Sequence, residues 1–220
     1  MLKIDLQFFG GRGTDSTSGG ASGGLDGNDI LSTRSLVSER ERNADMVDQT
    51  LGVFKDAYSD YGTQINDIQI AKLKPNASAI AYYDSSDNIA INERYFNKAT
   101  MESAYAKCVE SGFHPSNGKR TATEAVVAHE VGHKLTADVA AKMGKQGFMG
   151  LDVAAVSITR KAMRKTGHKN WKTFAQAISG YSTHSHAETV AEAFSDVYCN
   201  GKGAKRESLA VVAVIDSYLK

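Results

Sequence analysis

The chain has 220 residues, of which 41% are hydrophobic and 23% are charged, and its formal net charge is +1. This composition is typical of a globular protein with one sizeable domain. The balanced charge argues against an extended basic face, and no run approaches the ~18 apolar residues that cross a bilayer, so we expect neither a nucleic-acid nor a membrane partner. The two cysteines, Cys108 and Cys199, are expected to be reduced, partly buried thiols.

The N-terminus begins with a short apolar peptide, MLKIDLQFF. Asp5 and Gln7 interrupt it and no small-residue cleavage site follows, so we expect no signal peptide. Residues 10–29 are rich in Gly, Ser, Thr and Asp, which predicts a flexible linker. The peptide on this tether is either a docking or sorting tag or an ordinary frayed terminus. We therefore assign residues 1–35 to a peptide and linker, and residues 36–220 to one folded domain.

The first part of this domain changes from a helical to an alternating period. Residues 43–61 place apolar side chains at helical spacing, and Gly62 ends the run. Three alternating segments follow, and the turn-forming sequence DSSD between the last two predicts a hairpin. A second helix is expected from Glu93 to Glu110, with Asn92 as its N-cap and Gly112 after its end. The alternating segments are residues 66–73, 78–84 and 88–92.

The second part of the domain reads as helical. Thr121 and Glu124 have the spacing of a capping box, which predicts that a helix begins there. The order of one helix, a small sheet and then several helices indicates an α+β fold with a small antiparallel or mixed sheet and an active-site helix. The further predicted helices are residues 152–166, 170–179, 186–199 and 206–219.

The helix that begins after Thr121 carries the sequence HEVGH. His129 and His133 are one turn apart, so both imidazoles project from the same side, as two nitrogen ligands of one zinc ion require. Glu130 lies about 100° round the helix from His129, where it can take a proton from a zinc-bound water. Gly132 leaves space close to the backbone. The alternative is a chance string, which would have no third ligand elsewhere.

A candidate third ligand lies on the predicted helix 186–199. Its apolar positions span about 120° of one face, and Glu188, Glu192 and Asp196 form a line outside that stripe. Such a row is usually a solvated face. Beside an H-E-x-x-H helix, however, one carboxylate can ligate zinc while the next orients a ligand histidine.

Four other histidines compete for a role. His184 and His186 lie just before or at the start of the same helix and are rival ligands, ranked lower because they are not on the face that carries the acids. His114 and His168 are expected to be loop histidines without a role in the chemistry.

The motifs H-E-x-G-H, a glycine-containing tyrosine segment and E-x-x-A-E-A-F together resemble the zincin metallopeptidases of the gluzincin type. Within this type, the motifs are similar to those of the catalytic domain of anthrax lethal factor and of zincin-like domains of bacteriophage head-associated proteins. The likeness covers roughly residues 65–198, and its specific part is two helices and Tyr181. The resemblance implies a zincin fold and a Zn²⁺ cofactor. The implied residues are the zinc ligands His129, His133 and Glu188, the general base Glu130, the oxyanion-stabilising Tyr181, and Glu192 behind the ligands.

This implied site is chemically consistent. One carboxylate with two imidazoles leaves zinc with one formal positive charge, which keeps it acidic enough to bring bound water toward a pKa of about 7. A phenol near the metal can donate a hydrogen bond to the anionic tetrahedral oxygen.

The resemblance also suggests how a substrate is held. In zincins, the edge strand beside the active-site helix pairs with an extended peptide. By this analogy we expect residues 88–92 to be that edge and to bind substrate. These residues are Asn88, Ile89, Ala90, Ile91 and Asn92.

The N-terminal sequence is also similar to an LQFF peptide that recurs in proteins encoded by phages and integrative elements of Gram-positive bacteria. It implies a phage-encoded protein of the host cytoplasm or virion, with capsid or portal proteins as partners. We therefore predict a zinc-dependent endopeptidase that acts on a peptide or protein substrate. One alternative is a non-catalytic phage structural or interaction protein, against which Glu130 and Tyr181 argue because binding needs neither. Another is an injected toxin with the same chemistry.

Overall fold

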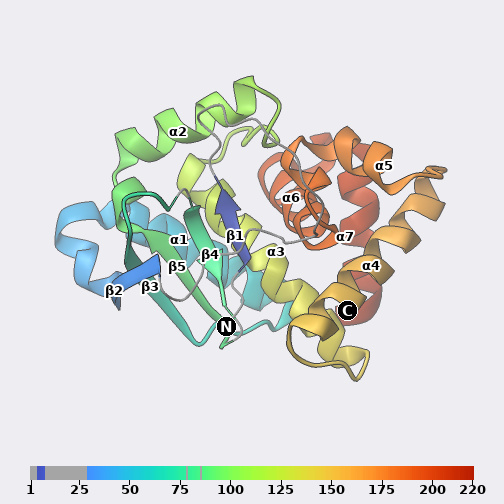
Figure 1. The fold of residues 1–220 in the computed structure, drawn as a ribbon, viewed down its shortest axis with the longest axis horizontal. Coiled ribbons are helices and arrows are strands. Elements are labelled where there is room, and N and C mark those ends of the chain that lie inside the picture. Colours follow the sequence, from blue (N-terminus) through green and yellow to red (C-terminus); the bar gives the residue numbers. More distant parts are fainter. Residues whose placement is uncertain (1–3, 8–28, 78, 85) are drawn as a thin grey trace.

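The computed structural model describes residues 4–7, 29–77, 79–84 and 86–220. The architecture is α+β, with a five-stranded sheet on one side and a group of helices on the other (Figure 1). This confirms the predicted α+β class. Within the described ranges, every helix is too short or too polar to span a membrane.

The sheet is mixed, with the strand order β1-β4-β5-β3-β2. The β3–β5 pair is parallel and the other pairs are antiparallel. The predicted hairpin is confirmed in β4–β5, where Ala81 lies opposite Ile91. Its turn is held by Asp84, whose Oδ1 accepts from the N–H groups of Ser86 and Asn88 at 2.8 and 3.1 Å. The strands are β1 Ile4–Gln7, β2 Ile30–Ser35, β3 Asp67–Leu73, β4 Ala79–Tyr83 and β5 Asn88–Asn92.

The predicted substrate-binding edge is wrong. Residues 88–92 form β5, which lies in the middle of the sheet and is paired on both sides, with β4 and with β3. Its backbone groups are therefore already used, and Ile89, Ala90 and Ile91 are fully buried. Alternation of apolar residues shows that a segment is a strand, but it does not say which strands lie beside it.

The predicted start of the domain at residue 36 is also wrong. Residues 30–35 form β2 and residues 4–7 form β1, so parts of the supposed peptide and linker are strands at the two edges of the sheet. Most side chains of β2 are exposed, so it lacks the apolar pattern that marks a strand in a sequence. Residues 8–28, which hold almost all of the predicted linker, lie outside the described residues.

The predicted helices are present, with shifted ends. α1 spans Arg40–Tyr61, and Gly62 ends it with a φ of 66°, a left-handed conformation that favours glycine. Asn92 caps only a short 3₁₀ turn, by accepting from the N–H of Arg94, and Asn97 caps the helix that follows. The other helices are α2 Lys98–Glu110, α3 Ala122–Lys142, α4 Gly147–Thr166, α5 Trp171–Ile178, α6 His186–Asn200 and α7 Arg206–Leu219.

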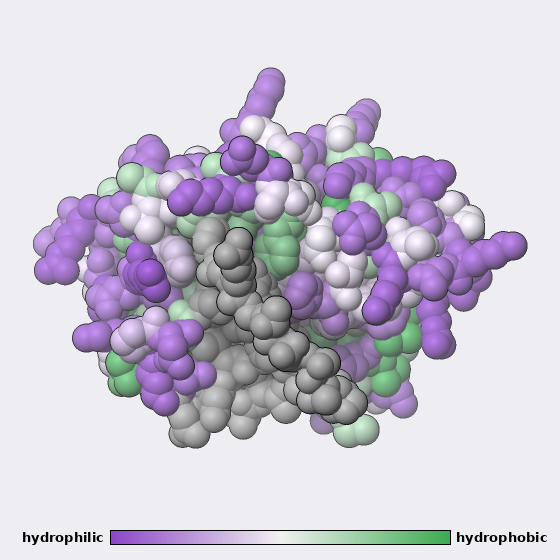
Figure 2. Space-filling view, turned by 45° about the horizontal axis from the view of Figure 1, so that its top comes forward, coloured by the Kyte–Doolittle hydropathy of each residue, from purple (hydrophilic) through white to green (hydrophobic). Residues whose placement is uncertain are grey.

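α3 is the central helix and begins at the predicted capping box. Thr121 Oγ1 accepts from the N–H of Glu124 at 3.2 Å, and Glu124 Oε2 accepts from the N–H of Thr121 at 2.8 Å. The helix contacts the sheet through β4 and β1 and also packs on α1, α2, α4, α6 and α7. Almost every residue of its first four turns is buried. The face of the molecule in Figure 2 is, by contrast, mostly hydrophilic where it is described.

A close approach between α3 and α6 depends on Gly132. A Cβ atom at this position would lie 2.7 Å from the Cα of Ala191, which is closer than real Cβ contacts allow. The glycine of the HEVGH sequence therefore brings the two helices together at the level of the histidines.

Candidate metal centre

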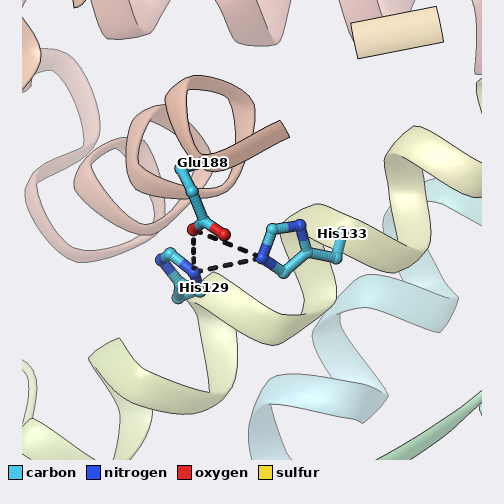
Figure 3. Close-up of side chains that lie close together, drawn as sticks. All are labelled: His129, His133 and Glu188. Carbon is cyan, nitrogen blue, oxygen red and sulfur yellow. Dashed lines mark hydrogen bonds and ion pairs between the residues drawn. The ribbon is translucent and has the colours of Figure 1, made fainter. Parts of the chain in front are cut away.

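The two histidines of α3 and one glutamate of α6 meet at a single point (Figure 3). His129 Nε2 lies 3.0 Å from Glu188 Oε2, His133 Nε2 lies 3.5 Å from the same oxygen, and the two Nε2 atoms are 3.2 Å apart. Glu188 is 55 positions beyond His133 in the sequence. All three side chains are buried, with exposures of 1%, 0% and 6% for His129, His133 and Glu188.

These distances fit a tetrahedral zinc site. With ligand atoms at the usual ~2.0–2.1 Å, neighbouring ligand atoms of such an ion are about 3.3 Å apart. Although Glu188 Oε2 is 3.0 Å from His129 Nε2, it makes no hydrogen bond of normal geometry with any described residue. The three candidate ligand atoms thus lie within 3.5 Å of one another around a common position. Two imidazole nitrogens and one carboxylate are a protein donor set found in catalytic zinc sites.

Glu192 contacts the ring of His129 at the nitrogen that does not face Glu188. Its Oε1 lies 2.8 Å from His129 Nδ1. A carboxylate at Nδ1 keeps the proton on that nitrogen and leaves the lone pair of Nε2 for a metal. Ser179 Oγ donates to the other oxygen, Oε2, at 2.7 Å. Glu192 therefore contacts both His129 and Ser179.

His114 is a member of this cluster that the sequence did not reveal. We expected a loop histidine without a role, but the structure buries it against Glu192, with Nδ1 3.0 and 3.1 Å from the two carboxylate oxygens. Its ring lies parallel to that of Tyr105, with centroids 5.6 Å apart. No local pattern distinguishes such a histidine, because its partner is 78 positions away in the sequence.

The rival histidines lie elsewhere. His186 Nδ1 is 2.6 Å from Thr159 Oγ1, and its ring stacks on Trp171. His184 Nδ1 is 3.0 Å from the carbonyl oxygen of Tyr181 and its residue is exposed. His168 Nε2 lies 3.0 Å from Glu207 Oε1. Among the described residues, none of these joins the group whose ligand atoms lie within 4.8 Å of one another.

Tyr181 is beside the ligands, in the short 3₁₀ turn that precedes α6. Its ring centroid is 5.9 Å from that of His129, and 3% of the residue is exposed. The N–H of Tyr181 donates to the carbonyl of Phe113 at 2.9 Å, and the N–H of Gly180 donates to the carbonyl of Gly112 at the same distance. This pairing of two distant loops brings Tyr181 and His114 to one side of the cluster.

The acidic line of α6 is buried and not a solvated face. Glu188, Glu192 and Asp196 are 6%, 1% and 3% exposed. Asp196 accepts from Asn200 and from the N–H of Lys205, so it joins the end of α6 to the next segment. On α3, Glu130 is fully buried next to His129. A helix enclosed on all sides has no solvated face, and its polar residues must meet partners.

The charges of the cluster suit a divalent cation. Burial alone would lower the pKa of His129, but the carboxylates of Glu188 and Glu192 raise it to about 10. Burial acts to raise the pKa of Glu188, but His133 and His129 outweigh it and hold the value at about 2. His114 and His129 likewise lower the pKa of Glu192 against the effect of its burial. Both carboxylates are therefore ionised at neutral pH.

Comparisons of this chain with protein-family models, with curated proteins and with solved structures found no significant match.

Proposed function

We propose that this protein is a zinc-dependent endopeptidase with a zincin fold of the gluzincin type. The observation that carries the proposal is the meeting of His129, His133 and Glu188 at distances that fit one tetrahedral ion. A chance H-E-x-x-H string would have no reason to meet a buried carboxylate from another helix. A site that only stabilised the fold would need neither an adjacent buried glutamate nor a tyrosine beside the ligands.

The zinc ion, when bound, supplies a Lewis acid that polarises the scissile carbonyl and acidifies water. Glu130 then takes the proton from the attacking water and delivers it to the leaving amine, as general base and general acid in turn. The Tyr181 hydroxyl donates to the oxyanion that develops on the carbonyl. Glu192 and His114 hold the ring of His129 in the orientation in which its Nε2 faces the ion.

The proposal is tested by metal analysis and by cleavage of a peptide library with the full chain and its Glu130→Gln variant. We expect both proteins to contain about one zinc per chain. The amide of the variant cannot act as a base, so we expect cleavage to fall at least about 10²-fold. The resemblance to phage head-associated domains makes capsid and portal proteins the first protein substrates to try.

Two results would contradict the proposal in different ways. A Glu130→Gln protein that cleaves as fast as the parent rules out Glu130 as the base. A zinc-containing parent that cleaves no peptide, yet binds a phage protein, supports the non-catalytic alternative.

A further inference from the structure

β4 is the strand that the metal-carrying helix contacts, and β1 covers its outer edge. α3 contacts both β4 and β1, and Figure 1 shows β1 as a dark blue arrow beside β4. Without β1, the N–H and C=O groups along that side of β4 would be open to pair with another chain. β1 therefore occupies the edge of the sheet nearest the candidate metal centre.

The β1–β4 pair has the geometry of a peptide added to a sheet edge. It is antiparallel, with residues 4–6 opposite residues 83–81 and a shift of register after Leu6. In this mode of binding, main-chain hydrogen bonds hold an extended peptide and pockets beside the strand select its side chains. An extended substrate on β4 would form the same ladder, and the two strands exclude each other.

β1 is suited to exchange with such a peptide. It has four residues, fewer than the usual ~5–6. Residues 8–29 separate it from β2, at the opposite edge of the sheet. A four-residue strand makes few main-chain hydrogen bonds, so it pairs weakly. Its covalent connection to the rest of the chain nevertheless keeps it near β4, at an effective concentration on the order of a millimolar.

We propose that residues 4–7 of this chain occupy, in cis, the edge at which an extended peptide substrate binds, so that a substrate must displace β1. This inference extends the proposed function. It rests on that function only in treating the bound peptide as a substrate. The N-terminal segment then competes with the substrate for the edge of β4 and lowers the apparent affinity of the protein for that substrate. The partner that fits this edge is an unfolded or extended segment of protein.

A cavity at one end of this edge lies where a selected side chain would fit. It has a volume of about 210 Å³, and its lining includes Tyr83 at the end of β4 and Lys134, which follows His133 on α3. Because Ile4 pairs with Tyr83, a substrate strand in the register of β1 would pass this cavity. Residues of β4 and of α3 thus line the same cavity.

The test keeps the full chain and removes the ability of β1 to pair. Asp5→Pro together with Leu6→Pro removes two successive backbone N–H groups, one of which faces β4 in a ladder. Proline also fixes φ near −65°, away from strand values. The matched control, Asp5→Asn with Leu6→Val, keeps both amides. Both pairs are made in the Glu130→Gln background, so that no probe is cleaved.

The measurement is binding of a fluorescent peptide with the sequence LKIDLQFF, followed by anisotropy. We expect the double-proline chain to bind it about tenfold or more tightly than the control, because the tethered competitor has been removed. The same peptide with both prolines should not bind. Zinc content should be equal in all chains.

The outcomes separate the two proposals. Equal affinity of the proline chain and its control overturns the inference about β1, whatever the cleavage assays show. Tighter binding by the proline chain, combined with no cleavage when Glu130 is restored, leaves the peptide edge in place and removes the endopeptidase. If both proposals hold, restoring Glu130 in the proline chain lowers KM about tenfold while kcat stays unchanged.

Discussion

The contact between α3 and α6 and the pairing of β1 with β4 represent two different kinds of construction in this molecule. α3 and α6 meet through buried side chains and a glycine contact that leaves no room for a methyl group. β1 meets β4 through four residues of main chain at the edge of a sheet. The first contact brings three candidate ligand atoms to within a few tenths of an ångström of tetrahedral spacing. The second is the contact that, on our proposal, opens to admit a peptide substrate. The proposed peptidase would combine a rigid centre with an edge that yields to substrate.

The largest expected effect comes from removing the candidate metal ligands at the contact between α3 and α6. We expect His133→Ala and Glu188→Ala to purify without zinc, because two remaining ligands no longer define a site. His186→Ala is the matched control, since His186 contacts Thr159 instead, and should keep about one zinc per chain. Metal analysis of the three proteins checks this. Zinc loss in His186→Ala with retention in Glu188→Ala would reverse the assignment.

A second test adds a methyl group at the close contact between α3 and α6. Gly132→Ala places a methyl group 2.7 Å from the Cα of Ala191, and we expect it to lower the free energy of unfolding of the metal-free protein by about 1–3 kcal/mol. Gly52→Ala on α1 meets nothing within 4 Å. It should raise the free energy of unfolding by roughly 0.5–1 kcal/mol, since alanine is the better helix former.

Urea denaturation of both glycine variants checks the comparison. Opposite signs would show that the α3–α6 contact, and not a general property of helical glycines, sets the effect. A Gly132→Ala protein as stable as Gly52→Ala would mean that the helices are free to separate.

The outer contacts of the cluster should have a smaller effect than its ligands. We expect Glu192→Gln and His114→Ala to weaken zinc binding about 10–100-fold, because they release the ring of His129 rather than remove a ligand. His168→Ala, whose partner is Glu207, is the control and should bind zinc like the parent. Competition with a chromophoric chelator measures the three affinities. Parent-like affinity in His114→Ala would mean that Ser179 and the rest of the cluster hold Glu192 in place alone.

The last prediction concerns the protons that zinc binding releases. In the metal-free protein the pKa of His129 is raised to about 10, so its ring carries a proton at neutral pH that zinc must displace. The apparent affinity should therefore rise about tenfold per pH unit between pH 7 and 9 and level off as the pH passes the raised pKa. Calorimetry in two buffers of different ionisation enthalpy should show about one proton released per zinc. A pH-independent affinity over this range would contradict the ion pairing of His129.

Local signals in the sequence predicted features of α3, α1 and the β4–β5 hairpin. The capping box of Thr121 and Glu124, the turn spacing of His129 and His133, and the glycine that ends α1 are all encoded within a few residues, and each appears as expected. The same is true of the β4–β5 hairpin, because the two strands are joined by a short turn. Short-range patterns determine such features because the backbone geometry leaves few alternatives.

Only the tertiary structure decided which distant segments become neighbours. It put β5 in the middle of the sheet, used residues 4–7 and 30–35 as edge strands, and buried His114 against Glu192. None of these has a local signature, since strand order and buried polar contacts depend on how the whole chain closes on itself. The sequence by itself determined two histidines at ligand spacing and offered a candidate third ligand. The fold determined that all three share one point, because Gly132 lets two helices approach closely enough for their side chains to meet.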